Sequence, residues 1–235
     1  MGYEVYTDDL ANLQITENKK IINTINPHSY VTAKGDPLFE TALRDSNILI
    51  PDGSGIVLAA KQIYRKSIKK IAGTDLHYFL LAKMNEVNGK VFYMGASQNT
   101  LDKIEERIKL EYPNIKVESY SPPFKPIFSQ EEDEVIIEKI NAFKPDVLFI
   151  GMTAPKQEKW LHQHKEKLDF KIACSIGAVF DFYAGTVQRP SQFWIDLHLE
   201  WLPRLLKEPK RLWRRNFVST PLFLIDLILY KLRIK

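Results

Sequence analysis

The second half of the chain alternates short apolar segments with longer helical ones, and this alternation is the strongest constraint on its fold. Strands are predicted at residues 90–94, 115–120, 146–151 and 171–176, with helices over 99–110, 131–143 and 155–168 between them. Such alternation indicates βαβ units, and strands that are apolar throughout indicate a parallel sheet covered on both faces. We therefore predict an α/β fold, a Rossmann-like, mostly parallel sheet with helices on both faces.

The first half predicts the same kind of unit from weaker patterns. Thr16 with residues 18–26 is typical of a capped helix, because Ile21, Ile22 and Ile25 would share one apolar face. Residues 29–33 then predict a strand, and a helix over residues 37–44 leads to a second strand at 48–50. After Asp52 come helices over residues 56–64 and from Gly73 to about Val87.

From Ser191 onward the pattern changes to helices without strands, predicted over residues 192–202, 203–207 and from Pro209 to the end. Residues 200–235 hold nine Lys or Arg against three Asp or Glu, so residues 1–199 carry a net charge of −2 in a chain of +4. The apolar segment 221–230 is about half of the roughly 20 residues that a membrane span requires. We predict a catalytic domain over residues 1–190 and a basic helical appendage over 191–235.

The appendage allows three interpretations. An apolar strip flanked by basic residues suits a helix that rests on an anionic membrane surface. Alternatively, the helix packs on the domain and leaves its basic face in water. A basic tail could also bind nucleic acid, but we expect vesicle binding and no nucleic-acid partner.

Composition fits a single main domain in a reducing compartment. With 235 residues, of which 45% are hydrophobic, the chain can bury a full core. Its single cysteine, Cys174, lies in an apolar strand and predicts a buried thiol. The N-terminal residues lack the basic start and apolar core of a signal peptide. We expect a cytoplasmic protein.

Asp52 is the first candidate for chemistry, because it follows a predicted strand in the sequence Pro51-Asp52-Gly53-Ser54-Gly55. Loops at the carboxyl ends of parallel strands line the ligand crevice, and glycines let a ligand approach the backbone. The alternative is an aspartate that only caps a helix. Small or polar residues follow the other predicted strands and would meet at the same edge: Thr32 with Lys34, Gly95 with Ser97, Gly151 with Thr153, and Gly177 with Asp181.

The chain lacks the sequence motifs of several enzyme classes. It contains neither a Gly-x-Gly-x-x-Gly nor a Gly-x-x-x-x-Gly-Lys-Ser/Thr sequence, which argues against a dehydrogenase or an NTPase. There is no Asp-x-Asp pair to hold a divalent ion against a diphosphate. His162 and His164 are two residues apart on a predicted helix and would project to different sides. We therefore expect no metal site and no cofactor.

Five blocks of sequence together resemble the WecG/TagA/CpsF family of bacterial glycosyltransferases. They occur in the family's order between about Ile15 and Asn216. The blocks are Pro51-Asp52-Gly53-Ser54-Gly55, Ala72-Gly73-Thr74-Asp75-Leu76, 151–160 (GMTAPKQEKW), 177–190 (GAVFDFYAGTVQRP) and 200–215 (EWLPRLLKEPKRLWRR).

The resemblance implies an inverting, metal-independent transfer of a sugar from a UDP donor to a polyprenyl-diphosphate-linked sugar in surface-polysaccharide synthesis. An N-acetylhexosamine such as N-acetylmannosamine is the expected donor sugar. The enzyme would work at the inner face of the cytoplasmic membrane. The resemblance does not decide whether it forms a homo-oligomer.

The resemblance also assigns roles to residues. Asp52 would be the general base, and Thr32 and Gln157 would line the donor pocket. Arginines of the appendage would close over the site and hold the diphosphate. The full set of predicted binding residues is Thr32, Lys34, Gly53, Lys70, Gly95, Gln157, Asp181, Arg204, Arg211 and Arg214.

Two positions differ from the family pattern. Lys34 stands where an asparagine is common, and Lys70 stands where an arginine precedes the Gly-x-Asp-Leu turn; lysine keeps the charge but loses the bidentate fork. The alternative function is therefore a catalytically impaired protein that binds a nucleotide sugar or a lipid diphosphate.

Overall fold

The structure is a computed structural model that describes residues 1–15, 18–188, 191, 193–194 and 201–233. Within the last range, the side chains of residues 204, 207, 211 and 233 are not described. The predicted helix cap Thr16 and most of the predicted helix over residues 192–202 lie outside the described residues.

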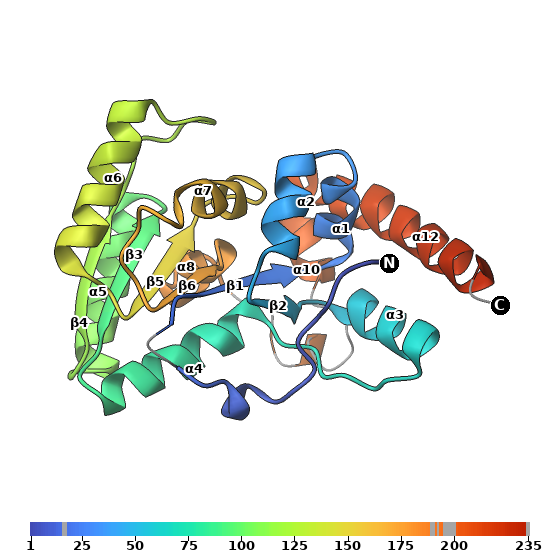
Figure 1. Cartoon of the computed structure of the whole chain (residues 1–235), viewed down its shortest axis with the longest axis horizontal. Coiled ribbons are helices and arrows are strands. Elements are labelled where there is room, and N and C mark those ends of the chain that lie inside the picture. Colours follow the sequence, from blue (N-terminus) through green and yellow to red (C-terminus); the bar gives the residue numbers. More distant parts are fainter. Residues whose placement is uncertain (16–17, 189–190, 192, 195–200, 234–235) are drawn as a thin grey trace.

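Six strands form one sheet in the order β2-β1-β6-β5-β3-β4, and every neighbouring pair is parallel. The predicted α/β, Rossmann-like fold with a parallel sheet is therefore confirmed (Figure 1). The strands are β1 (Lys20–Ile25), β2 (Ile48–Pro51), β3 (Lys90–Gly95), β4 (Lys116–Tyr120), β5 (Val147–Gly151) and β6 (Ile172–Ser175).

Helices connect the strands and cover the sheet. Those before β6 are η1 (Leu10–Asn12), α1 (Pro27–Ala33), α2 (Pro37–Arg44), α3 (Ser54–Tyr64), α4 (Gly73–Glu86), α5 (Gln98–Glu111), α6 (Gln130–Phe143) and α7 (Lys156–His164). Those after β6 are α8 (Ala178–Tyr183), α10 (Trp201–Lys207), α11 (Pro209–Arg214), η2 (Arg215–Ser219) and α12 (Thr220–Arg233).

Successive side chains along each strand point to opposite faces of the sheet, and a hydrophobic core forms on each face. Tyr93 and Phe149 point to the face covered by α4, α5 and α8, whereas their neighbours Phe92 and Leu148 point to the face covered by α6 and α7. All four are almost completely buried. Because both faces are covered, these strands are apolar throughout, as their sequence indicated.

The order of the first strand and the first helix is a correction to the sequence prediction. Residues 20–25 form β1 rather than a helix, and residues 27–33 form α1 rather than a strand. The apolar spacing of Ile21, Ile22 and Ile25 fits a helix, but β1 lies between β2 and β6 and buries both of its faces. Asn26 caps α1 and Pro27 occupies its first turn, which together are a helix-start signal.

The C-terminal helix α12 packs on α1 and α3 and projects at the end of the molecule (Figure 1). Phe223 is buried against the ring of Tyr30, with 5.3 Å between the ring centroids. Lys34 Nζ lies 2.6 Å from Asp226 Oδ2 and ties the end of α1 to α12. Of the helices that the structure describes, none combines the length and apolar character needed to cross a bilayer.

Gly151, at the end of β5, tests how tightly the sheet edge is packed. A Cβ atom there would overlap the buried ring of Phe180, so Gly151→Ala should lower the free energy of unfolding by about 1–3 kcal/mol. Gly35→Ala is the matched control, because its Cβ would meet only Thr32 O at 3.8 Å. Urea unfolding measures both; equal midpoints for the two variants would contradict the prediction.

Candidate functional site

A cavity of about 1700 Å³ opens along the carboxyl edge of the sheet. Chain connections diverge at this edge: β3 leads outward through α5 to β4, whereas β5 leads back through α7 to β6. Ligands of open α/β sheets bind at such a switch point. Drug-sized ligands occupy pockets of roughly 300–1,000 Å³, so this cavity has room for two substrates together.

Two glycines form the cavity floor at the switch point. Gly95 and Gly151 are paired at the ends of β3 and β5, and both line the cavity. Gly95 has φ +113°, and a Cβ atom there would lie 2.5 Å from the Gly151 carbonyl oxygen. A side chain is excluded at this position, which leaves bare backbone for a ligand to approach.

Asp52 lies in the cavity wall between the end of β2 and the start of α3. Its backbone N–H donates to Ile25 O at 2.9 Å, which fixes the loop to the end of β1. Gly53 follows with φ +98° as the N-cap of α3. Asp52 thus directly precedes the N-terminus of α3, the end of a helix that carries partial positive charge.

The loop after β1 adds a polar wall that includes Asn26 and His28. Asn26 Oδ1 accepts from the backbone N–H groups of His28 and Ser29, both at 3.0 Å. His28 Nδ1 lies 2.9 Å from Ser219 Oγ and so connects α1 to η2. Burial, then the positive charges of Arg215 and Arg214, lower the pKa of His28. This imidazole is therefore neutral at pH 7.

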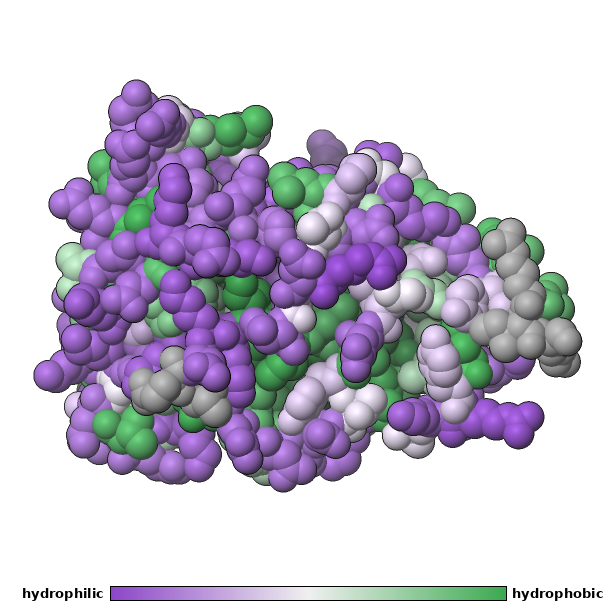
Figure 2. All heavy atoms as spheres, in the orientation of Figure 1, coloured by the Kyte–Doolittle hydropathy of each residue, from purple (hydrophilic) through white to green (hydrophobic). Residues whose placement is uncertain are grey.

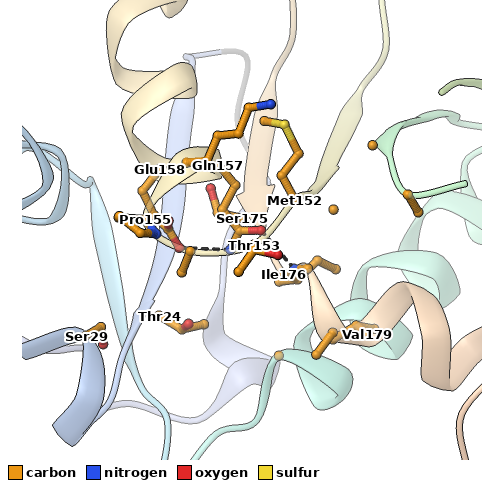
Figure 3. A pocket seen from close by; sticks show the side chains of 18 of the residues that line it. Thr24, Ser29, Met152, Thr153, Pro155, Gln157, Glu158, Ser175, Ile176 and Val179 are labelled. Carbon is orange, nitrogen blue, oxygen red and sulfur yellow. Dashed lines mark hydrogen bonds between the residues drawn. The ribbon is translucent and has the colours of Figure 1, made fainter. Parts of the chain in front are cut away.

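Gln157 and Glu158, at the start of α7, form a buried polar chain beside β6 (Figure 3). Gln157 Nε2 donates to Glu158 Oε1 at 2.8 Å, and Gln157 Oε1 accepts from the Gly177 N–H at 3.1 Å. The Gly177 N–H fixes which way the amide points. Gln157 thus has one further N–H to offer a ligand.

Burial raises the pKa of Glu158 to about 7. Its Oε2 atom has no hydrogen-bond partner among the residues that the structure describes, and the same is true of Ser175 Oγ at the end of β6. A buried carboxyl group next to a cavity wall is stable mainly as the neutral acid.

Six of the predicted site residues line this single cavity, although they come from five separate parts of the chain. They are Asp52, Gly53, Lys70, Gly95, Gln157 and Asp181. Asp181 Oδ1 also accepts from Thr186 Oγ1 at 3.3 Å. Asp75, from the second of the five sequence blocks, accepts from the Ala72 N–H in the first turn of α4.

Three predicted residues are not among those that line the cavity. Thr32 lies in the last turn of α1, where its hydroxyl donates to His28 O at 2.8 Å. Lys34 pairs with Asp226, and Arg214 is exposed on α11. The side chains of Arg204 and Arg211 lie outside the described residues.

Other cavity residues were missed because the first strand was misplaced. Since β1 ends at Ile25, the threonine near the end of the first strand is Thr24, and the asparagine two residues later is Asn26. Both line the cavity, whereas Thr32 and Lys34 do not. The signal was the sequence Asn26-Pro27, which favours a turn and a helix start. His28 and Arg215 were also missed.

Metal ligands need several His, Cys, Asp or Glu side chains in one place. Across the described residues, no three such side chains gather closely enough to hold an ion. His162 and His164 face different partners: His162 Nδ1 lies 3.8 Å from Asp45, and His164 Nε2 lies 3.4 Å from Asp133.

A cavity at the switch point of a parallel sheet is where open α/β proteins bind their ligands, and this cavity has a carboxylate and a lysine in its wall. The glycosyl transferase WecG/TagA/CpsF family matches the chain over residues 2–235. The chain belongs to this family and is a glycosyltransferase.

Three relatives carry the name N-acetylglucosaminyldiphosphoundecaprenol N-acetyl-beta-D-mannosaminyltransferase. The protein of Bacillus spizizenii is 33% identical over 211 residues, which cover 89% of this chain and 80% of the relative. The protein of Bacillus subtilis is 29% identical over 208 residues, which cover 88% of this chain and 78% of the relative. The protein of Staphylococcus aureus strain MW2 is 27% identical over 239 residues, which cover 97% of this chain and 91% of the relative.

The raised pKa of Glu158 predicts a pH-dependent stability. Between pH 4.5 and about 7 the folded protein holds this proton and the unfolded chain has lost it, so stability falls as pH rises through that window. Glu158→Gln should abolish this decline and gain on the order of 1–3 kcal/mol over wild type at pH 7.5. Urea unfolding between pH 4 and pH 8 measures the difference.

Glu166→Gln, on an exposed residue just after α7, is the control and should follow wild type at every pH. A difference between Glu158→Gln and wild type that stays constant with pH would contradict the assignment.

Proposed function

We propose that this glycosyltransferase moves an N-acetylhexosamine, with N-acetylmannosamine the first candidate, from a UDP donor to a polyprenyl-diphosphate-linked N-acetylglucosamine. The family membership and the names of the three relatives support this substrate pair. The observation that carries the proposal is Asp52 in the wall of a cavity with room for donor and acceptor side by side.

Asp52 is the general base in this reaction. Its carboxylate takes the proton of the acceptor hydroxyl, whose oxygen forms the new bond to the anomeric carbon while the bond from that carbon to the UDP oxygen breaks. Such proton transfer contributes typically 10²- to 10⁴-fold. Inversion follows from a single displacement, because the acceptor attacks opposite the leaving group.

UDP leaves with additional negative charge, which cationic and N–H groups must stabilise. Lys70 and Arg215 line the cavity and supply positive charge, and no metal ion is required in this scheme. The free N–H of Gln157 and the amide of Asn26 orient the donor. We assign the donor contacts to Thr24 and Asn26, which line the cavity, and not to Thr32 and Lys34, which do not.

The appendage, residues 191–235, holds the enzyme on the inner face of the cytoplasmic membrane in this proposal. Phe223 and Leu227 of α12 face the domain, whereas its opposite face exposes a row of large apolar side chains. Leu222, Leu224, Ile225, Ile228, Leu229 and Leu232 make up this apolar face of α12. Apolar faces of this kind, with basic residues alongside, bind at a lipid surface.

Replacing Asp52 tests the catalytic role. Asp52→Asn keeps the size of the side chain but cannot accept a proton, so kcat should fall about 10²- to 10⁴-fold with thermal stability unchanged within a few degrees. UDP release with a synthetic lipid-diphosphate N-acetylglucosamine acceptor measures this rate. Asp102→Asn, on an exposed part of α5, should keep wild-type activity; a similar rate for Asp52→Asn would refute the role.

Charged substitutions on the apolar face of α12 test membrane binding. Ile225→Asp with Ile228→Asp should reduce co-sedimentation with phosphatidylglycerol vesicles about tenfold or more, because each removes a large apolar side chain from the lipid. Val87→Asp is the control, since Val87 is as exposed but lies at the amino edge of the sheet. Equal vesicle binding of both variants would overturn membrane attachment through α12.

A further inference from the structure

A second apolar projection stands apart from α12, in the loop between β4 and α6. Residues 121–128 of this loop contain Pro122, Pro123 and Pro126. Phe124 is fully exposed and Ile127 is 81% exposed. In Figure 1 the loop extends outward beyond the start of α6, and Figure 2 shows hydrophobic atoms at the end of this projection.

The base of the loop is held firmly, so the exposure of its tip is built into the fold. Lys156 Nζ donates to Lys125 O at 2.5 Å and lies 3.5 Å from the centre of the buried Phe128 ring. Lys125 Nζ pairs with Glu132 Oε2 at 2.6 Å. At the start of the loop, Ser121 Oγ donates to Ala96 O at 2.8 Å. The polar groups point inward and the two apolar side chains outward.

The loop and the helices before α12 border the same cavity. Residues 121–128 line it on the side of β3 and β4, and Arg215, Phe217 and Thr220 line it on the side of η2 and α12. Phe217 is exposed and lies three residues before α12 begins. Exposed apolar residues therefore border the cavity on both of these sides.

We propose that Phe124 and Ile127 insert into the same lipid leaflet as α12 and form a second membrane contact across the cavity mouth. This inference rests on the proposed function, because it takes the acceptor to be lipid-linked. A polyprenyl chain stays in the leaflet while its diphosphate sugar enters the cavity. A mouth bounded by lipid on both sides would place that sugar before Asp52.

Charge and shape favour a lipid surface over a second copy of the chain. Lys210 and Arg214 are exposed on α11, a helix whose Leu212 lines the cavity, and exposed cations of this kind attract anionic headgroups. Two apolar side chains on a narrow projection offer far less area than the roughly 800 Å² per partner of a stable protein interface. Partial insertion into a leaflet needs no such area.

A fluorescent label on the loop tests the insertion directly. Cys174 is fully buried, so an introduced cysteine can be labelled selectively in the full chain. We would place an environment-sensitive dye at Phe124→Cys, at Ile228→Cys on α12 and at Leu110→Cys. Leu110 is 84% exposed near the end of α5, at the amino edge of the sheet, and is the matched control.

Addition of vesicles of phosphatidylglycerol and phosphatidylethanolamine should shift the dye emission to the blue at positions 124 and 228 and leave it unchanged at 110. A shift at 228 without one at 124 would overturn the loop contact while membrane attachment stands. A shift at 124 that depends on protein concentration without vesicles would show a second copy of the chain and would also overturn it. Absence of sugar transfer with both shifts present would refute the proposed function alone.

Charged substitutions give an independent measurement. Phe124→Asp with Ile127→Asp should lower the partition onto these vesicles about tenfold, whereas Leu110→Asp should stay within twofold of wild type. Thermal unfolding checks that each variant is folded. Wild-type partition of the folded double variant would overturn the proposal.

Discussion

The parallel pairing of β3 with β5, and their divergence beyond the paired Gly95 and Gly151, is the constraint on which the site depends. Parallel strands place all their carboxyl ends at one edge, and the next elements turn away in opposite directions there. No side chain at Gly95 can fill the space between them, because a Cβ atom there would meet the Gly151 carbonyl oxygen. Apolar packing on both faces keeps these strand ends fixed, so the cavity is a consequence of the core.

The attachment of α12 is a second consequence of close packing, at the other end of the sheet. A Cβ atom on Gly55 would lie 2.5 Å from Pro27 Cγ and 3.4 Å from the Phe223 ring, so glycine lets α1, α3 and α12 meet. Phe223 and Leu227 fill the contact, while the ion pair from Lys34 to Asp226 is exposed on the lysine side and adds little. The helix is oriented by its two buried residues, and that orientation leaves its large apolar face uncovered.

The fold could be predicted from the sequence where the hydrophobic pattern fitted only one kind of element. The prediction was wrong where the pattern fitted both a helix and a strand. The apolar strands at 90–94 and 146–151 could only be buried strands, and helix α2 was predicted with its correct bounds. Ile21, Ile22 and Ile25 satisfy both a helical face and a strand buried on two faces, and only the position of β1 between β2 and β6 decides. That one error placed expected site residues at Thr32 and Lys34, which do not line the cavity, whereas Thr24 and Asn26 do. Glu158 could not be recognised because its burial depends on tertiary packing.

The position of Asp52 also explains how a modest base can serve the proposed transfer. A carboxylate placed just before the N-terminus of a helix is in general stabilised as the anion, which makes it a weak base. When the bond to UDP is largely broken, the attacking hydroxyl becomes acidic and a weak base suffices. The rate of the proposed reaction then depends mainly on the groups that would stabilise UDP, namely Lys70, Arg215 and the N–H donors around the cavity. Arg215 begins η2, in the segment that leads to α12, so attachment of the appendage and stabilisation of the leaving group depend on the same helices.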